Sequence, residues 1–253
     1  MKNNIQKNEI MNAFNEAVHA EVAALNTADI KNFSDLLNDV VAQAGQNQTD
    51  AVERISRVVT AVYGAANVTG LRLGYLRFSK AFTHPLTMAD TNGFLHVGYR
   101  SGQHTTSDEQ FIAVILHEAG HVMNGHMWTR YQWLATALSA ALAFSLNIPL
   151  AASGLAWYLS LPISIIGALA VGQLLFAQLY QYQEYSADRF VASYGFAPEM
   201  ADWLEETNAE WIASGAIPHY IEADTSWLRG FRFAFSTHPS VASRVHYLRN
   251  NSK

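Results

Sequence analysis

The chain is organised around the stretch Leu116-His117-Glu118-Ala119-Gly120-His121-Val122. Its two histidines are four residues apart, so on a helix they lie on the same face in successive turns. Glu118 directly follows the first histidine and projects beside that face. Two neutral imidazoles that hold a metal, next to a carboxylate that handles the proton of a water molecule, form the arrangement of zinc hydrolases. The five-residue pattern also arises by chance, so its meaning depends on the rest of the chain.

The residues before this stretch predict a buried helix with a well-defined start. Ser107-Asp108-Glu109-Gln110 fits a capping box, and its acidic pair suits the positive end of the helix dipole. An almost unbroken apolar run follows from Phe111 to Leu116. A buried helix that presents the histidine pair is a better metal-site candidate than an exposed one. The metzincin class is excluded, because its glycine and third histidine would fall at Asn124 and Met127.

A third metal ligand is required, because catalytic zinc is held by three protein groups and keeps one position open. Glu184 is the first charged residue after a long uncharged stretch, and Asp188 follows one helical turn later. We expect Glu184 to complete a site with His117 and His121, and Asp188 to accept the free ring N–H of a metal-bound histidine. In the alternative interpretation, the two acids begin a helix that has no connection with His117.

The uncharged stretch extends from Tyr131 to Gln183 and contains no Asp, Glu, Lys, Arg or His. Its two apolar segments, residues 134–152 and 155–180, are each long enough to cross a bilayer, which takes about 20 residues. Ser153-Gly154 predicts the turn between them, and Asn147 to Pro149 is an earlier alternative.

We expect residues 132–181 to form a hairpin of two transmembrane helices. The alternative is a hairpin buried inside a soluble protein. Arg130 and Arg189 flank the hairpin, whereas its turn is uncharged, so the positive-inside rule places the catalytic side in the cytoplasm, at an inner or other cytoplasm-facing membrane.

The remaining composition excludes several other classes. The 253-residue chain has a formal net charge of −5 and no long basic run, which argues against a nucleic-acid partner. It contains no cysteine, so disulfides and cysteine-ligated zinc are excluded. The first 20 residues lack the continuous apolar core of a secretory signal.

Residues 1–66 predict amphipathic helices, interpreted either as a substrate- or partner-binding cap or as helices that pack on a catalytic domain of residues 67–253. Asp50 with Glu53 is a weak capping-box signal for the last of these helices. Alternation predicts strands over residues 68–78 and 94–99. The second strand is expected to be the edge along which an extended substrate pairs.

His238-Pro239 precedes a last predicted helix that carries Arg244. His238 is a candidate to hydrogen-bond the oxyanion of a reaction intermediate, with Tyr220 and Arg244 as weaker candidates. Alternatively, His238 occupies the open metal position and keeps the enzyme latent, or it only forms the turn into the helix.

These motifs resemble, in order and spacing, those of the HtpX-like and CaaX-prenyl-endopeptidase-like gluzincin metallopeptidases. The resemblance covers roughly residues 93–250 and rests on His117-Glu118-Ala119-Gly120-His121 with His126, on Glu184-Tyr185-Ser186-Ala187-Asp188-Arg189, and on Ser236-Thr237-His238-Pro239 with Arg244. It implies the following roles: zinc ligands His117, His121 and Glu184, general base Glu118, supporting Asp188, and His238 and Arg244 near the active site.

The resemblance also implies a membrane hairpin between the first two motifs. The chain departs from the HtpX-like pattern in two places. Its amino-terminal helices are amphipathic where that branch has a transmembrane pair, and Asn92-Gly93-Phe94 replaces the usual Asn-Ala-Phe.

The sequence therefore predicts a mainly α (α+β), zincin-type fold with a small edge β-sheet and an apolar helical hairpin inserted between the zinc-ligand helices. The predicted function is that of a membrane-associated zinc endopeptidase with one Zn²⁺ per chain. Its partners would be protein or peptide substrates, membrane proteins among them, and the lipid bilayer. Two alternatives are a non-catalytic membrane scaffold with a structural zinc site and a soluble metallopeptidase with a buried hairpin.

Overall fold

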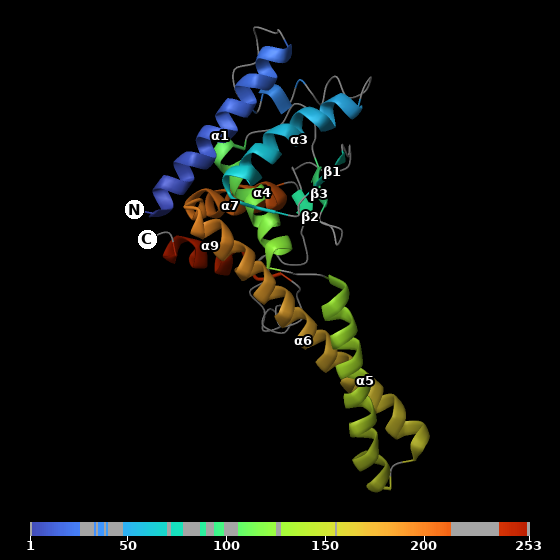
Figure 1. Cartoon of the computed structure of the whole chain (residues 1–253). Helices are drawn as coiled ribbons and strands as arrows, with labels where there is room; N and C mark the ends of the chain where they lie inside the picture. The colour runs from blue at the N-terminus through green and yellow to red at the C-terminus, as the bar shows by residue number, and fades with distance from the viewer. Residues whose placement is uncertain are drawn as a thin grey trace. The chain divides into compact units, whose positions relative to one another are not determined.

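The computed structural model is mainly helical and divides into two units (Figure 1). The core unit comprises Met1–His126, Tyr185–Ala216 and Val241–Lys253, and the hairpin unit comprises Met127–Glu184 and Ile217–Ser240. The structure describes residues 2–25, 33, 35–37, 39, 48–69, 72–77, 87–89, 94–98, 106–124, 128–154, 156–213 and 238–251.

Two amino-terminal helices belong to the core unit, α1 (Lys2–Leu25) and α3 (Gln48–Ala65). Because α3 begins at Gln48, Asp50 lies in its first turn, so the capping box predicted at Asp50 is wrong. The carboxylate of Asp50 still suits the positive end of the helix dipole. Most of the helix expected between α1 and α3 lies outside the described residues.

A three-stranded sheet contains β1 (Arg72–Arg77), β2 (Thr87–Ala89) and β3 (Phe94–Gly98) in the order β1-β3-β2. Strand β1 is parallel to β3, and β2 is antiparallel to β3. The strand predicted as an edge is therefore the central strand, and the prediction is wrong on this point. The error arises because β2 also pairs with β3, and β2 is too short for an alternating pattern to be recognised in the sequence.

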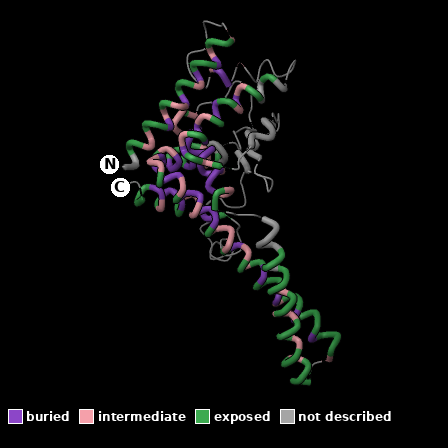
Figure 2. Tube along the Cα trace, in the orientation of Figure 1, coloured by how far each residue is buried: buried purple, intermediate pink, exposed green. Residues whose placement is uncertain are grey.

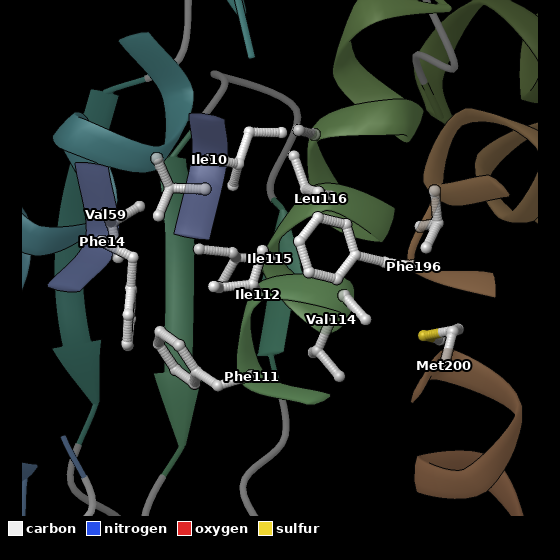
Figure 3. Packing of buried hydrophobic residues seen from close by; sticks show 14 of the residues in the cluster. Ile10, Phe14, Val59, Phe111, Ile112, Val114, Ile115, Leu116, Phe196 and Met200 are labelled. Atoms are coloured by element: carbon white, nitrogen blue, oxygen red, sulfur yellow. The ribbon is translucent and has the colours of Figure 1, made fainter. Parts of the chain in front are cut away.

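The core is built on α4 (Asp108–Met123), against which the amino-terminal helices pack (Figure 3). Phe14 of α1 and Phe111 of α4 both contact Phe33, with ring centroids 5.1 Å and 4.4 Å away. Phe196 and Met200 pack on the other side of the cluster. The amino-terminal helices thus share one hydrophobic core with α4, while the predicted domain boundary at residue 66 stays a prediction.

The remaining helices are α5 (Trp128–Ala152), α6 (Trp157–Ser193), α7 (Ala197–Ala213) and α9 (Val241–Asn250). The long helix α6 belongs to both units, because the boundary falls directly after Glu184 without interrupting the helix. It ends at Ser193, and Gly195, two residues further on, has a φ of 85°, which is accessible mainly to glycine.

Helices α5 and α6 form the predicted hairpin, with the predicted turn at Ser153-Gly154. Gly154 has a φ of 87°, a left-handed conformation that favours glycine. The alternative turn at Asn147 to Pro149 is wrong, because α5 continues through Pro149 to Ala152. By length and apolar composition α6 is able to cross a membrane, and residues Thr136–Ala152 form a shorter apolar helix.

Most described residues of α5 and the first part of α6 are exposed (Figure 2). Large apolar side chains are among the exposed residues, whereas several of the buried ones are small. Phe144, Trp157 and Ile166 are all more than two-thirds exposed. Ser160, Ser164 and Ala168, spaced four residues apart on one face of α6, are almost fully buried. A core that forms in water buries its large apolar side chains, so the burial pattern of the hairpin is the reverse.

Candidate metal centre

Helix α4 has the start that the sequence predicts. The Ser107 hydroxyl accepts a hydrogen bond from the Gln110 N–H, and the Gln110 side-chain carbonyl accepts one from the Ser107 N–H, which completes a capping box. From Gln110 to His117 every residue is buried. The cap and this buried stretch fix the rotation of α4, and with it the direction in which the histidine pair points.

The three predicted ligands lie together. One ligand atom each from His117, His121 and Glu184 lies within 4.8 Å of the others. Glu184 ends the first segment of the hairpin unit, but it shares one uninterrupted helix with Tyr185 and Asp188 of the core unit. Its position relative to these residues therefore follows from helix geometry.

The two histidines fit a tetrahedral metal site. Their Nε2 atoms are 3.2 Å apart. Two nitrogens bound to zinc at about 2.0–2.1 Å in tetrahedral geometry are about 3.3 Å apart. With a carboxylate as the third group, the donor set is one that catalytic zinc sites use.

Asp188 holds His117 in the orientation that metal binding requires. Its carboxylate is fully buried and lies 3.0 Å from His117 Nδ1. When Nδ1–H donates to this carboxylate, the lone pair of Nε2 remains available for the metal. The predicted contact between Asp188 and a ligand histidine is therefore present, and the histidine is His117.

Arg244 of α9 pairs with the same carboxylate. Its Nε and Nη2 donate to Oδ2 and Oδ1 of Asp188 at 2.9 Å and 2.6 Å. Burial alone would raise the pKa of Asp188, but the charge of Arg244 and the hydrogen bond from His117 outweigh burial and lower it. Asp188 therefore stays ionised between its two partners.

Tyr63 is a residue near the site that sequence reasoning missed. Its hydroxyl donates to the backbone carbonyl of Ile115 at 3.1 Å. Burial, followed by the negative charge of Glu118, raises the pKa of Tyr63. In the sequence Tyr63 is only one more apolar position of a helix, so no signal distinguishes it. The contact connects α3 to the turn of α4 before Glu118.

His238 lies close to the third ligand. Its Nε2 is 3.7 Å from Glu184 Oε1, which is an ion-pair distance when the imidazole is protonated. The side chain of His238 is about half exposed. Tyr220, the other candidate for the oxyanion role, lies outside the described residues, as does His126.

Paired histidines on one helix, a glutamate on a second helix and a further carboxylate next to the first histidine define the class of zinc-dependent hydrolases. The chain belongs to Peptidase family M48, because the model of that family matches residues 5–252. No curated protein and no solved structure showed a significant match. The predicted family resemblance is confirmed, and the protein is a zinc metallopeptidase. The match includes the amino-terminal helices, which the resemblance seen in the sequence did not cover.

Proposed function

We propose that the protein is a membrane-embedded zinc endopeptidase in which His117, His121 and Glu184 hold the metal and Glu118 is the general base. The observation that carries this proposal is the convergence of the three ligand atoms within 4.8 Å, with the two Nε2 atoms 3.2 Å apart. The half-buried Glu118 directly follows a ligand, at the position of the general base in such motifs.

When bound, zinc brings the pKa of a water molecule towards about 7 and polarises the scissile carbonyl. Glu118 takes the proton from the attacking water and later delivers it to the leaving amine. His238 stabilises the oxyanion of the tetrahedral intermediate by a hydrogen bond, a role supported by its position beside Glu184. Asp188 and Arg244 keep His117 in place through the cycle.

The hairpin supports insertion in a lipid bilayer. Burial of small residues with exposure of large apolar ones is the packing expected where lipid, and not water, surrounds a helix pair. Exposed aromatic side chains lie at both ends of the uncharged part of α6, Trp157 and Tyr158 at its start and Tyr182 near Glu184. The 26 residues from Trp157 to Tyr182 span about 38 Å of helix. This length exceeds the hydrocarbon core of about 30 Å and lies within the full bilayer of about 40–45 Å.

This arrangement implies which substrates the site reaches. Glu184 follows Tyr182 by two residues on the same helix, so the metal site lies close to the membrane surface. We place the catalytic side in the cytoplasm, as the flanking Arg130 and Arg189 suggest. Substrates would be proteins or peptides at that surface, membrane proteins included.

Glu118→Gln tests the general base. We expect the purified variant to lose about 10²–10⁴-fold in peptide hydrolysis while it still binds one zinc per chain. Glu109→Gln, in the first turn of the same helix, is the matched control and should keep full activity. Retained hydrolysis by Glu118→Gln contradicts the role of Glu118 as the base.

Two further measurements address the alternatives. If the wild-type protein with zinc bound hydrolyses no peptide, and chelation unfolds it, the zinc is structural and the protein is a scaffold. Release of the protein from membranes by carbonate contradicts the transmembrane hairpin. The exposed apolar side chains of α5 and α6 do not favour a hairpin buried in a soluble protein.

A further inference from the structure

The backbones of α4 and α6 approach each other closely at Gly120. A Cβ atom placed on Gly120 would lie 3.0 Å from Ala187 Cα, 3.0 Å from Phe190 Cβ and 3.3 Å from Ala187 Cβ. The nearest atoms are backbone or the first carbon of a side chain, so none can move away by a change of rotamer. Any substitution at Gly120 must therefore displace one helix from the other.

This contact lies at the level of the ligands on both helices. Gly120 is between His117 and His121 on α4, and Ala187 is between Glu184 and Asp188 on α6. We propose that Gly120, packed against Ala187, sets the spacing between the two ligand-bearing helices. Gly120 is then a positioning residue: it touches neither metal nor substrate, but determines whether Glu184 reaches the metal held by the histidines. The inference rests on the ligand set proposed above.

The magnitudes support this role. Relief of contacts at 3.0–3.3 Å requires a displacement of a few tenths of an ångström. Metal–ligand distances vary by only about 0.2 Å between well-formed sites. Because Glu184 is buried, its side chain has little room to rotate and compensate, so a displacement of this size shifts its carboxylate by as much as the site tolerates. The expected consequence is a loss of zinc affinity, even where the fold is retained.

Gly120→Ala tests the inference in the full-length protein in detergent. We expect a 10- to 100-fold lower zinc affinity, measured by competition with a chromophoric chelator. Thermal unfolding of the metal-free protein should change little, because alanine favours a helix over glycine and offsets part of the packing cost. Zinc affinity and metal-free stability are thus uncoupled, which a purely structural role would not produce.

Gly64→Ala is the matched control, because Gly64 is also helical but a Cβ there meets nothing within 4 Å. This variant should keep its zinc affinity and become slightly more stable. Wild-type zinc affinity in Gly120→Ala overturns the proposal. A parallel fall of zinc affinity and metal-free stability also overturns it, because the contact then serves the fold alone.

Ala187→Ser adds one atom to the same contact on the α6 side. We expect this variant to lose less zinc affinity than Gly120→Ala. Wild-type affinity in Ala187→Ser overturns the proposal even if Gly120→Ala does not fold. Glu184→Ala distinguishes failure of the spacing proposal from failure of the proposed site. If Glu184→Ala binds zinc in full, the ligand set is wrong; if it loses zinc while Gly120→Ala does not, only the spacing proposal fails.

Discussion

The core unit and the hairpin unit place the same kinds of side chain in opposite environments. Phe14 in the core unit is fully buried, whereas Phe144 in the hairpin unit is 73% exposed. Conversely, the hairpin buries the hydroxyl-bearing Ser160 and Ser164, and the large fully buried side chains all belong to the core unit. The core unit therefore buries its large apolar side chains away from water, whereas the hairpin unit leaves its own exposed.

If the hairpin lies in a bilayer, as proposed, this difference reflects two driving forces that act along one chain. In water, burial of a phenylalanine is favourable because it removes apolar surface from the solvent. Between helices in lipid that gain is absent, and close packing of small residues becomes the main attraction. The transition occurs within α6, whose hairpin part exposes leucine and isoleucine and whose last turns bury Glu184, Asp188 and Val191. Under the proposed membrane insertion, the metal site lies where α6 passes from lipid to water.

The largest expected difference in stability is between two Phe→Ala substitutions, one in each unit. Phe14→Ala should lower the free energy of unfolding by about 3–5 kcal/mol, because it removes a buried ring that packs on Phe33 at 5.1 Å. Phe144→Ala should change it by less than about 0.5 kcal/mol, because the ring is 73% exposed. Chemical denaturation in detergent, followed by circular dichroism, measures both.

Membrane retention should show the reverse order for these variants. Phe144→Ala removes apolar surface exposed to lipid and should weaken partition into vesicles, whereas Phe14→Ala should not. Equal destabilisation by the two substitutions would mean that Phe144 is covered by protein, and the membrane proposal would fail.

A second, smaller effect concerns the packed face of the hairpin. Ser164→Leu introduces a large side chain at a fully buried position and should destabilise the hairpin by about 1–3 kcal/mol. Ile163→Leu, at the adjacent exposed position, is the matched control and should be neutral. Limited proteolysis in detergent, with cleavage sites mapped to residues 128–184, measures hairpin opening. Unchanged protection in Ser164→Leu would mean that α5 and α6 do not pack through this face.

The parts of the site that could be predicted from the sequence are those set by local geometry. His117 and His121 share a helix face, and Asp188 follows Glu184 by one turn, so their relations hold wherever the helices lie. The Ser107 cap and the Ser153-Gly154 turn also depend on neighbouring residues only, and both are confirmed.

The features that could not be predicted depend on distant parts of the chain. β2 has three residues and is stabilised by its pairing with β3, not by a pattern of its own. The bond from Tyr63 to Ile115 joins residues 52 positions apart, and the pairing of Arg244 with Asp188 spans 56. The close contact at Gly120 has Ala187 as its partner, which no local rule identifies.

The smallest expected effect on stability comes from a buried charge. The core unit contains buried charged side chains, whereas the middle of the hairpin contains no charged residue. Glu21 of α1 accepts hydrogen bonds from Arg57 and Arg54 of α3, and the bonds from Arg57 are the main cause of its lowered pKa. Because the pKa is lower in the folded than in the unfolded protein, this stabilisation is complete above the ordinary glutamate pKa of about 4.3. It is lost as the pH falls through the lower, folded-state value.

Glu21→Gln should therefore cost about 1 kcal/mol at pH 7, a modest value because Arg57 is half exposed and screened by solvent. The difference from wild type should disappear as the pH falls below about 4. Glu53→Gln is the control: Glu53 lies 4.0 Å from the same Arg57 but is 63% exposed, so no measurable change is expected. Thermal unfolding at several pH values measures both variants. Equal destabilisation by Glu21→Gln and Glu53→Gln would mean that the burial of Glu21 adds no stability to its ion pair.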